Sequence, residues 1–151
     1  MSVYQFKQND YLLSTDKNLL QTDVIHTFLA AQSYWAKDIP KSVVEKSIDA
    51  SLCFGIYHND EQVGFARVIS DYATFAYLCD VFITDEHRGK GLSKWMMEKI
   101  MEHPDLQNLR RFTLGTRDAH ELYRKFGFRE SDNACNNMEI RIQDIYIKMK
   151  Q

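Results

Sequence analysis

The chain has 151 residues, of which 44% are hydrophobic and 26% charged, and its formal net charge is −2 at pH 7. This length and composition predict a single domain over residues 1–151 with a core of its own, and they exclude a disordered or collagen-like chain. The near-neutral charge gives no support to a nucleic-acid partner or to a membrane surface bound through basic residues.

The first half of the chain predicts one strand, two helices and then three more strands. Tyr11–Ser14 is typical of a short strand, and apolar residues at helical spacing indicate a helix from Thr22 or Asp23. Pro40 suits the first position of a helix and predicts a second one that runs toward Ala50. The three strands are expected at Leu52–Tyr57, Gln62–Ser70 and Thr74–Ile83, with the first two joined as an antiparallel hairpin.

The second half predicts a helix, a strand, a shorter helix and two closing strands. The first helix is expected from about Gly91 to His103, because the residue before Pro104 is disfavoured in a helix. A strand at Arg111–Thr116 then precedes a helix over Asp118–Phe126. Alternating apolar residues suggest closing strands at Met138–Ile142 and Ile145–Met149. The order of elements predicts an α+β fold around one mixed sheet.

The ends of the shorter helix carry signals of their own. Asp118 and Glu121 have the spacing of a capping box, which predicts that Asp118 caps the N-terminus. Gly127 stands where a helix commonly ends in a left-handed residue.

The segment from Ile83 to Ser93 carries the strongest chemical signal. An apolar strand runs into a turn with Gly89 and Gly91, which opens directly into a helix. This arrangement points backbone N–H groups and a helix N-terminus at one place, as a pyrophosphate site needs, and the flanking Arg88 and Lys90 add positive charge. The alternative is an ordinary basic turn on the surface.

The charges are unevenly distributed along the chain. Residues 87–129 hold ten Lys and Arg against five Asp and Glu, so a segment of +5 lies in a frame of −7. Two solvated faces would explain this division, and so would an anion site beside a cation site.

Several other kinds of site are excluded or unsupported. The segment is not a Walker A loop, and Lys94 stands where a dinucleotide-binding fingerprint needs its third glycine. The three cysteines are widely spaced, and none of the five histidines lies in a zinc-binding pattern. The N-terminus has no signal pattern, and no apolar run approaches the ~18 residues of a membrane span. We expect a reduced, soluble, cytoplasmic domain without a metal.

Two motifs resemble those of the GCN5-related N-acetyltransferase (GNAT) family. Residues 88–93, Arg-Gly-Lys-Gly-Leu-Ser, are similar to its Gln/Arg-x-x-Gly-x-Gly/Ala motif, with Ser93 in place of the last small residue. Residues 119–128 are similar to its Ala-x-x-Leu-Tyr-x-x-x-Gly-Phe motif. The motifs come in the family's order, and the predicted layout agrees with its fold over nearly the whole chain.

The resemblance implies a GNAT-like fold and an acetyl-CoA co-substrate. The family has a central mixed, mostly antiparallel sheet flanked by helices, and it binds acetyl-CoA where the central strands splay. It implies a pyrophosphate site at Arg88, Gly89, Lys90, Gly91, Leu92 and Ser93, backbone amides of Phe82 and Ile83 beside the thioester, and Thr116 near the pantetheine arm.

The resemblance also implies a catalytic role for Tyr123, and Asp80 is a second candidate for one. Tyr123 matches the family's tyrosine acid, which protonates the departing thiolate. The alternative is that Tyr123 only packs in the core, on the apolar side of its helix. Asp80 is the only charged residue in Thr74–Ile83 and could be a base, an anchor for the substrate cation or a structural hydrogen-bond acceptor. Many members carry a Glu-Asp pair where this chain has Cys79-Asp80, so the first carboxylate is missing.

Four residues are candidate contacts to the acceptor. Arg67 could clamp a carboxylate, and the rings of Tyr34, Trp35 and Tyr72 could hold a cation. The leading interpretation is N-acetylation of a small amine or amino-acid-like acceptor by direct attack in a ternary complex. A protein or peptide acceptor, a non-catalytic acyl-CoA sensor and a binding domain with coincidental motifs are the alternatives, and a homodimer is left open.

Overall fold

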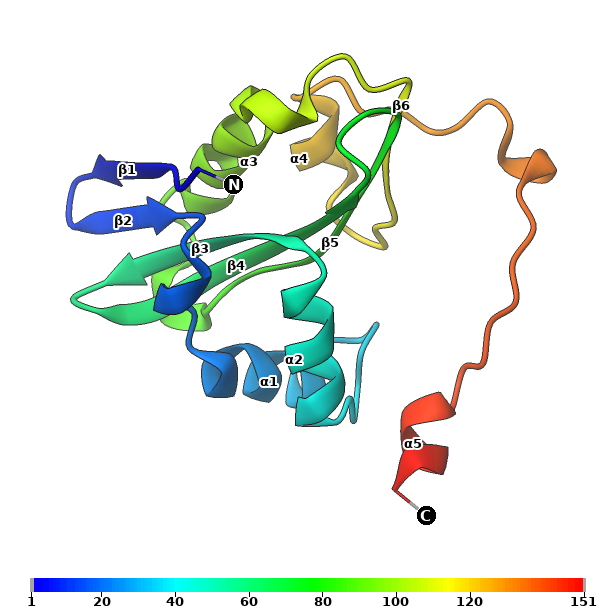
Figure 1. The fold of residues 1–151 in the computed structure, drawn as a ribbon, viewed down its shortest axis with the longest axis horizontal. Helices are drawn as coiled ribbons and strands as arrows, with labels where there is room; N and C mark the ends of the chain where they lie inside the picture. The colour runs from blue at the N-terminus through cyan, green and yellow to red at the C-terminus, as the bar shows by residue number, and fades with distance from the viewer. Residues whose placement is uncertain (1, 151) are drawn as a thin grey trace.

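The computed structural model describes residues 2–150 and centres on one sheet (Figure 1). Within these residues the sheet has six strands, which lie side by side in chain order. They are β1 (Gln5–Gln8), β2 (Tyr11–Ser14), β3 (Leu52–His58), β4 (Glu61–Ser70), β5 (Phe75–Ile83) and β6 (Arg111–Leu114). Every neighbouring pair is antiparallel except β5 and β6, which are parallel.

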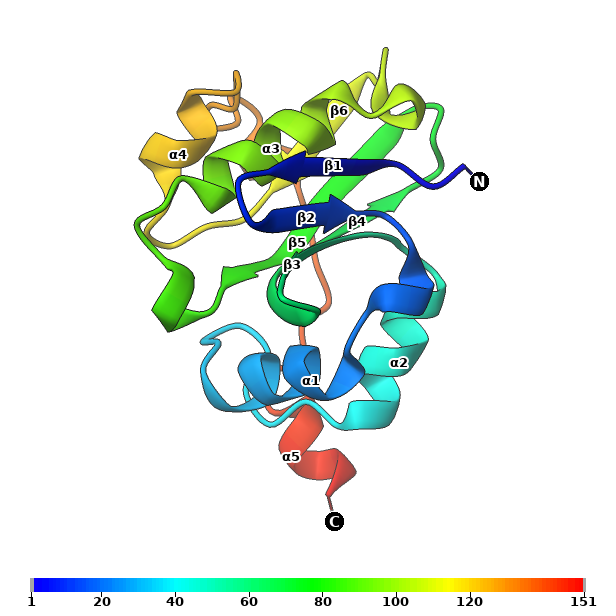
Figure 2. The same cartoon turned by 90° about the vertical axis from the view of Figure 1, so that its left-hand side faces the viewer.

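Helices cover both faces of this sheet (Figures 1 and 2). One face carries α1 (Thr22–Ala31) and α2 (Lys41–Asp49), and the other carries α3 (Leu92–Glu102) and α4 (His120–Arg124). A last short helix, α5 (Ile145–Met149), lies beyond the α1 and α2 layer at the end of an extended segment. Four single 3₁₀ turns occur at Lys17–Leu19, Asp85–His87, Pro104–Leu106 and Ala134–Asn136 in the described chain.

The two faces bury two separate apolar clusters. Side chains alternate along a strand, so β3 sends Phe54 to the cluster under α3 and Cys53 to the cluster under α1 and α2. β4 does the same with Ala66 and Phe65. The sheet thus forms the middle layer of a three-layer domain, with an apolar cluster on each of its faces.

A bulge at Asp80 changes the side-chain phase of β5. The register with β4 passes from Arg67 opposite Cys79 to Phe65 opposite Phe82, so β5 has one extra residue. Asp80 has a left-handed φ of +54°, which aspartate tolerates better than most residues. As a result Leu78 belongs to the cluster under α3 whereas Phe82 belongs to the cluster under α1 and α2. Strict alternation would have placed both on one face.

The parallel pair β5–β6 separates halfway along. Its pairing runs from Phe75 opposite Arg111 to Leu78 opposite Leu114 and then ends. In the described chain, Cys79–Ile83 therefore has a strand partner on the β4 side alone. This opening exposes backbone in the middle of the domain.

The structure confirms the predicted α+β fold with a mixed sheet and most of the predicted elements. The predicted strands and helices before residue 128 all appear, with ends that differ by a few residues. The strand β1 could not be predicted from the sequence, because three of its four residues are exposed and it carries little apolar pattern. It pairs with β2 at the edge of the sheet.

The predicted closing strands are wrong. Residues 137–142 have no regular secondary structure and join no strand of the described sheet, and Ile145–Met149 is a helix. The helix is held by Tyr146, which packs against the cluster under α1 and α2, and by an ion pair of 3.1 Å between Lys150 and Asp38. These contacts draw the segment away from its own sheet.

The predicted capping box is also wrong. The helix α4 begins after Ala119, and no side chain caps it in the described chain. Thr116 Oγ1 instead accepts a hydrogen bond of 3.0 Å from the N–H of Ala119, and Glu121 pairs with Arg124. The last predicted signal, Gly127, does have a left-handed φ of +92°.

Candidate active site

A cleft of about 1420 Å³ follows the opening between β5 and β6. The strip Leu78–Ile83 of β5 and the loop from Leu114 to Ala119 form its long sides. The turn before α3 lines one part of it, and the loop between α1 and α2 lines another. Pockets for drug-sized ligands usually measure ~300–1,000 Å³, so this cleft has room for a large co-substrate together with an acceptor.

The turn between β5 and α3 offers backbone N–H groups to the cleft. Gly89 and Gly91 have left-handed φ values of +77° and +75°, and a Cβ atom on either would meet no atom within 4 Å. Glycine is therefore required by the backbone conformation and not by lack of space. Gly91 is the N-cap of α3 and makes no side-chain cap. The first N–H groups of α3, from Leu92 and Ser93, are thus available to an anion.

Arg88 stabilises this turn as well as lining the cleft. Its Nε donates a hydrogen bond of 3.0 Å to the carbonyl of Ile83, and its Nη1 lies 2.8 Å from the carboxylate of Asp85. Lys90, by contrast, does not line the cleft. It stands between the two left-handed glycines, and its Nζ lies 3.4 Å from the hydroxyl of Tyr11 on β2. The structure therefore does not bring Lys90 into the expected pyrophosphate site.

The bulged part of β5 presents main chain to the cleft. The side chains of Phe82 and Ile83 are buried, and Phe82 stacks on Phe28 with 4.0 Å between ring centroids. Both residues still line the cleft. Because their side chains point into the core, the polar groups they can offer are those of the backbone.

Tyr123 on α4 also lines the cleft, and it is buried. Burial, helped by nearby Tyr34 and Asp118, raises the pKa of its phenol to about 12. The phenol is therefore protonated at neutral pH. A protonated phenol beside a cleft can donate a proton or a hydrogen bond.

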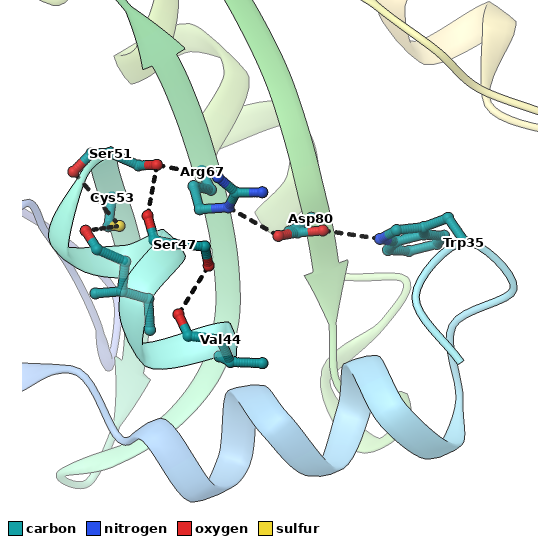
Figure 3. Close-up of polar contacts among 8 residues, drawn as sticks. Trp35, Val44, Ser47, Ser51, Cys53, Arg67 and Asp80 are labelled. Carbon is teal, nitrogen blue, oxygen red and sulfur yellow. Dashed lines mark hydrogen bonds and ion pairs between the residues drawn. The ribbon is translucent and has the colours of Figure 1, made fainter. Parts of the chain in front are cut away.

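Asp80 is held by two donors (Figure 3). Arg67 Nε on β4 donates to Oδ2 at 2.9 Å, and Trp35 Nε1 in the loop after α1 donates to Oδ1 at 2.9 Å. Arg67 Nη1 also donates to Ser51 Oγ at 3.0 Å, and the Ser51 hydroxyl donates to the carbonyl of Ser47 on α2. The network therefore joins both central strands to the α1 and α2 layer.

Cys79 occupies the position before this carboxylate. Burial, with the negative charge of Asp80 next to it, raises the pKa of the thiol to about 12. The thiol is thus protonated at neutral pH and supplies no anionic base in place of the missing carboxylate.

Comparison with known proteins agrees with this geometry. Residues 49–130 match the model of the acetyltransferase (GNAT) domain. A candidate acetyltransferase of Gibberella zeae is 36% identical, and the match covers 78% of each chain. This chain belongs to the GNAT family. It is accordingly an acyltransferase by family, and its fold and the order of its motifs are those of GNAT proteins.

Solved structures of GNAT proteins share the fold. A candidate GNAT acetyltransferase from Xanthomonas campestris pv. campestris is 52% identical, with a TM-score of 0.88 over 90% of this chain and 96% of that one. A GNAT acetyltransferase from Elizabethkingia anophelis, solved with acetyl-CoA bound, is 12% identical, with a TM-score of 0.62 over 83% of this chain and 80% of that one. The second likeness concerns the fold alone.

Most of the residues expected from the GNAT motifs do lie together. Lining the cleft are Phe82, Ile83, Arg88, Gly89, Gly91, Leu92, Ser93, Thr116 and Tyr123, together with Asp80, Arg67, Tyr34 and Trp35. Tyr72 does not line it and lies instead in the turn between β4 and β5, with a left-handed φ of +61°. The structure thus does not support a contact of Tyr72 with the acceptor.

Two features of the site were not predicted from the sequence. Tyr34 accepts a hydrogen bond of 3.0 Å from the N–H of Arg117, whose guanidinium lies 3.8 Å from the ring centroid of Tyr34. This contact joins the loop after α1 to the loop after β6 across the cleft. The far C-terminal residues Glu139 and Arg141 also line the cleft. No local motif marks contacts between segments so distant in sequence.

Between residues 2 and 150, no three His, Cys, Asp or Glu side chains gather closely enough to hold a metal ion. No helix in that range is long and apolar enough to cross a membrane.

Proposed function

We propose that this GNAT protein transfers the acetyl group of acetyl-CoA to the amino group of a small, amino-acid-like acceptor. The observation that carries the proposal is that one cleft is lined both by a surface suited to an anion and by a surface suited to a charged small molecule. An uncapped helix N-terminus with two left-handed glycines lies at one part, and a buried ion pair with aromatic rings lies at another.

The co-substrate fits the part of the cleft next to α3. The free N–H groups at the start of α3 and the turn glycines suit a pyrophosphate, because a helix N-terminus favours negative charge. The strip Cys79–Ile83, unpaired on the β6 side in the described chain, suits an extended amide-containing arm that needs backbone partners. Thr116 lines the facing wall, where its hydroxyl already accepts from Ala119.

Acetyl-CoA supplies a thioester whose carbonyl carbon the acceptor amine attacks. Backbone N–H groups at Phe82 and Ile83 would stabilise the negative charge that develops on the carbonyl oxygen. Tyr123 would protonate the sulfur as it leaves, since its phenol stays neutral at the pH of the reaction. The nitrogen loses one proton as the amide forms, and a proton returned through water would restore the phenol.

Asp80 has a positioning role in this proposal. Both of its carboxylate oxygens already accept hydrogen bonds, one from Arg67 and one from Trp35. Asp80 therefore holds Arg67 and Trp35 in place beside the acceptor, and in this proposal the amine arrives in its neutral form.

The acceptor part of the cleft carries both signs of charge. Arg67 and Arg141 are cationic, Asp80 and Glu139 are anionic, and all four line the cleft. A molecule with an amino group and a carboxylate could pair with both signs. The contact between Tyr34 and Arg117 spans the cleft and favours a small acceptor over a folded protein surface.

The test is the rate of CoA release with a matched panel of acceptors. Each amino acid is compared with its amide or decarboxylated amine, and a lysine peptide is included. We expect saturable release, with kcat/KM higher for the free carboxylate and reduced on the order of 10-fold or more in Arg67→Met. Equal rates for acids and amides, or a preference for the peptide, would reject the amino-acid-like acceptor. Calorimetric binding of acetyl-CoA without turnover of any amine would favour a sensor.

A further inference from the structure

The hydroxyl of Tyr11, at the start of β2, contacts the turn before α3 at two points. It forms a hydrogen bond of 2.8 Å with Nδ1 of His87, which directly precedes the turn. It also accepts a hydrogen bond of 3.4 Å from Nζ of Lys90, which lies between the two left-handed glycines. His87 lines the cleft, whereas Tyr11 does not. A residue outside the cleft therefore contacts the segment on which the proposed pyrophosphate site is built.

The turn has few hydrogen bonds of its own. Arg88 ties its start to the end of β5, but within residues 2–150 no backbone carbonyl accepts from the N–H of Gly89, Lys90 or Gly91. These N–H groups stay available to a phosphate, and the turn lacks the backbone bonds that would stiffen it. The two glycines add to its freedom, because glycine loses more conformational entropy on ordering than any other residue. Contacts from outside the turn are therefore needed to hold its shape.

Tyr11 is itself held firmly in the sheet. Its backbone pairs with Gln8 of β1 on one side and with His58 of β3 on the other. The ring of His58 lies 5.0 Å from the phenol ring and 5.1 Å from the ring of His87, measured between centroids. A side chain that is already fixed by its neighbours loses little entropy when it forms a further hydrogen bond. The phenol of Tyr11 can thus anchor the turn to the sheet.

We propose that Tyr11 is a positioning residue for acetyl-CoA. Its hydroxyl holds His87 and Lys90 and so keeps the turn before α3 in the conformation that receives the pyrophosphate. Like the proposed function on which it rests, this role requires acetyl-CoA to bind at the turn. The role also accounts for Lys90, whose ammonium fastens the turn to β2 instead of lining the cleft. A site that is ordered in advance binds more tightly, because binding then has less ordering to do.

Acetyl-CoA binding to Tyr11→Phe tests this role, because the change removes the hydroxyl and keeps the ring. We expect the Kd measured by calorimetry to rise about 5- to 10-fold, as for the loss of a hydrogen bond, with an unchanged kcat at saturating acetyl-CoA. Tyr72→Phe is the matched control, since Tyr72 lies outside the cleft in the turn between β4 and β5. It should leave the Kd unchanged.

A donor without the pyrophosphate separates positioning from a general loss of structure. S-acetylpantetheine carries the thioester and the pantetheine arm alone, so its kcat/KM should be the same for the wild type and Tyr11→Phe. A loss with this donor as large as the loss with acetyl-CoA would overturn the positioning role.

The variant His87→Leu removes the other partner of the 2.8 Å hydrogen bond. Combined with Tyr11→Phe, it should weaken acetyl-CoA binding by clearly less than the product of the two single losses, because both changes break the same bond. Losses that multiply would show that Tyr11 and His87 act separately, which would overturn the anchor.

The wild type distinguishes a failure of this role from a failure of the proposed function. Absence of acetyl-CoA binding to the wild type would reject both. Binding that is equally tight in the wild type and in Tyr11→Phe would overturn the role of Tyr11 and leave the proposed function standing.

Discussion

Asp80 combines a backbone task and a side-chain task in one residue. Its left-handed φ creates the bulge that turns Phe82 toward the α1 and α2 layer. Its carboxylate accepts hydrogen bonds from Arg67 and Trp35. The side chains of the ion pair are only 9% exposed for Asp80 and 15% exposed for Arg67. A largely buried charge is stable only when it is paired, so Arg67 and Asp80 depend on each other.

A double-mutant cycle measures this dependence. Asp80→Asn keeps a residue that tolerates the left-handed conformation, and Arg67→Met keeps most of the volume of the side chain. Each single change leaves one charge unpaired, and we expect each to lower the free energy of unfolding by about 2–3 kcal/mol. The double variant should lose clearly less than the sum. Additive losses in urea denaturation would show that the two charges do not stabilise each other.

The two ends of α3 illustrate how element termini position the site. At its N-terminus, Gly91 is left-handed and open to the cleft. We expect Gly91→Ala to lower the free energy of unfolding by about 1 kcal/mol and to weaken acetyl-CoA binding, because alanine disfavours this conformation. Gly115→Ala is the matched control, since Gly115 has equal space around it and no such φ. Equal stability of the two variants would mean that backbone conformation does not fix this turn.

At the other end of α3, His103 is 3% exposed, and its Nδ1 accepts a hydrogen bond of 3.1 Å from the N–H of Asp105. Its Nε2 is buried without a partner in the described chain. Desolvation lowers the pKa of the imidazole below its usual 6.5, so the ring is neutral in the folded protein. As the pH falls, the imidazole of the unfolded chain takes up a proton before that of the folded protein does. The contribution of neutral His103 to the free energy of unfolding is therefore fully present above about pH 6.5 and is lost as the pH falls toward the folded pKa.

The variant His103→Asn tests this pH dependence. Asparagine can still accept from the N–H of Asp105, but it does not titrate. Between pH 7.5 and pH 5.5, the wild type should lose more free energy of unfolding than the variant does. Equal slopes would show that His103 does not contribute to acid sensitivity.

At the scale of the whole molecule, the sequence predicted what local patterns encode. Apolar periodicity located the core strands and helices, and the glycines of the turn before α3 indicated the proposed anion site. The bulge at Asp80 was not predictable, because it depends on the pairing of β4 with β5. The course of residues 138–149 was mispredicted, because apolar alternation shows that a segment can be a strand but not which edge it will join. The Tyr34–Arg117 contact arises only when distant loops meet.

The cleft is likewise a property of the whole fold. It exists because β5 and β6 separate after Leu78 and Leu114, and α3 and α4 bring the turn and Tyr123 to the opening. Acetyl transfer is therefore expected to take place at this opening.

The most direct test of acetyl transfer there is turnover by the wild type and by Tyr123→Phe, with isotope-labelled acetyl-CoA and the best acceptor of the panel. Mass spectrometry detects the label on the acceptor nitrogen, and calorimetry measures acetyl-CoA binding. We predict labelled product from the wild type, and in Tyr123→Phe a kcat lower on the order of 10²-fold with an unchanged Kd. An undiminished kcat in Tyr123→Phe, or no labelled product from the wild type with any amine, would contradict the account.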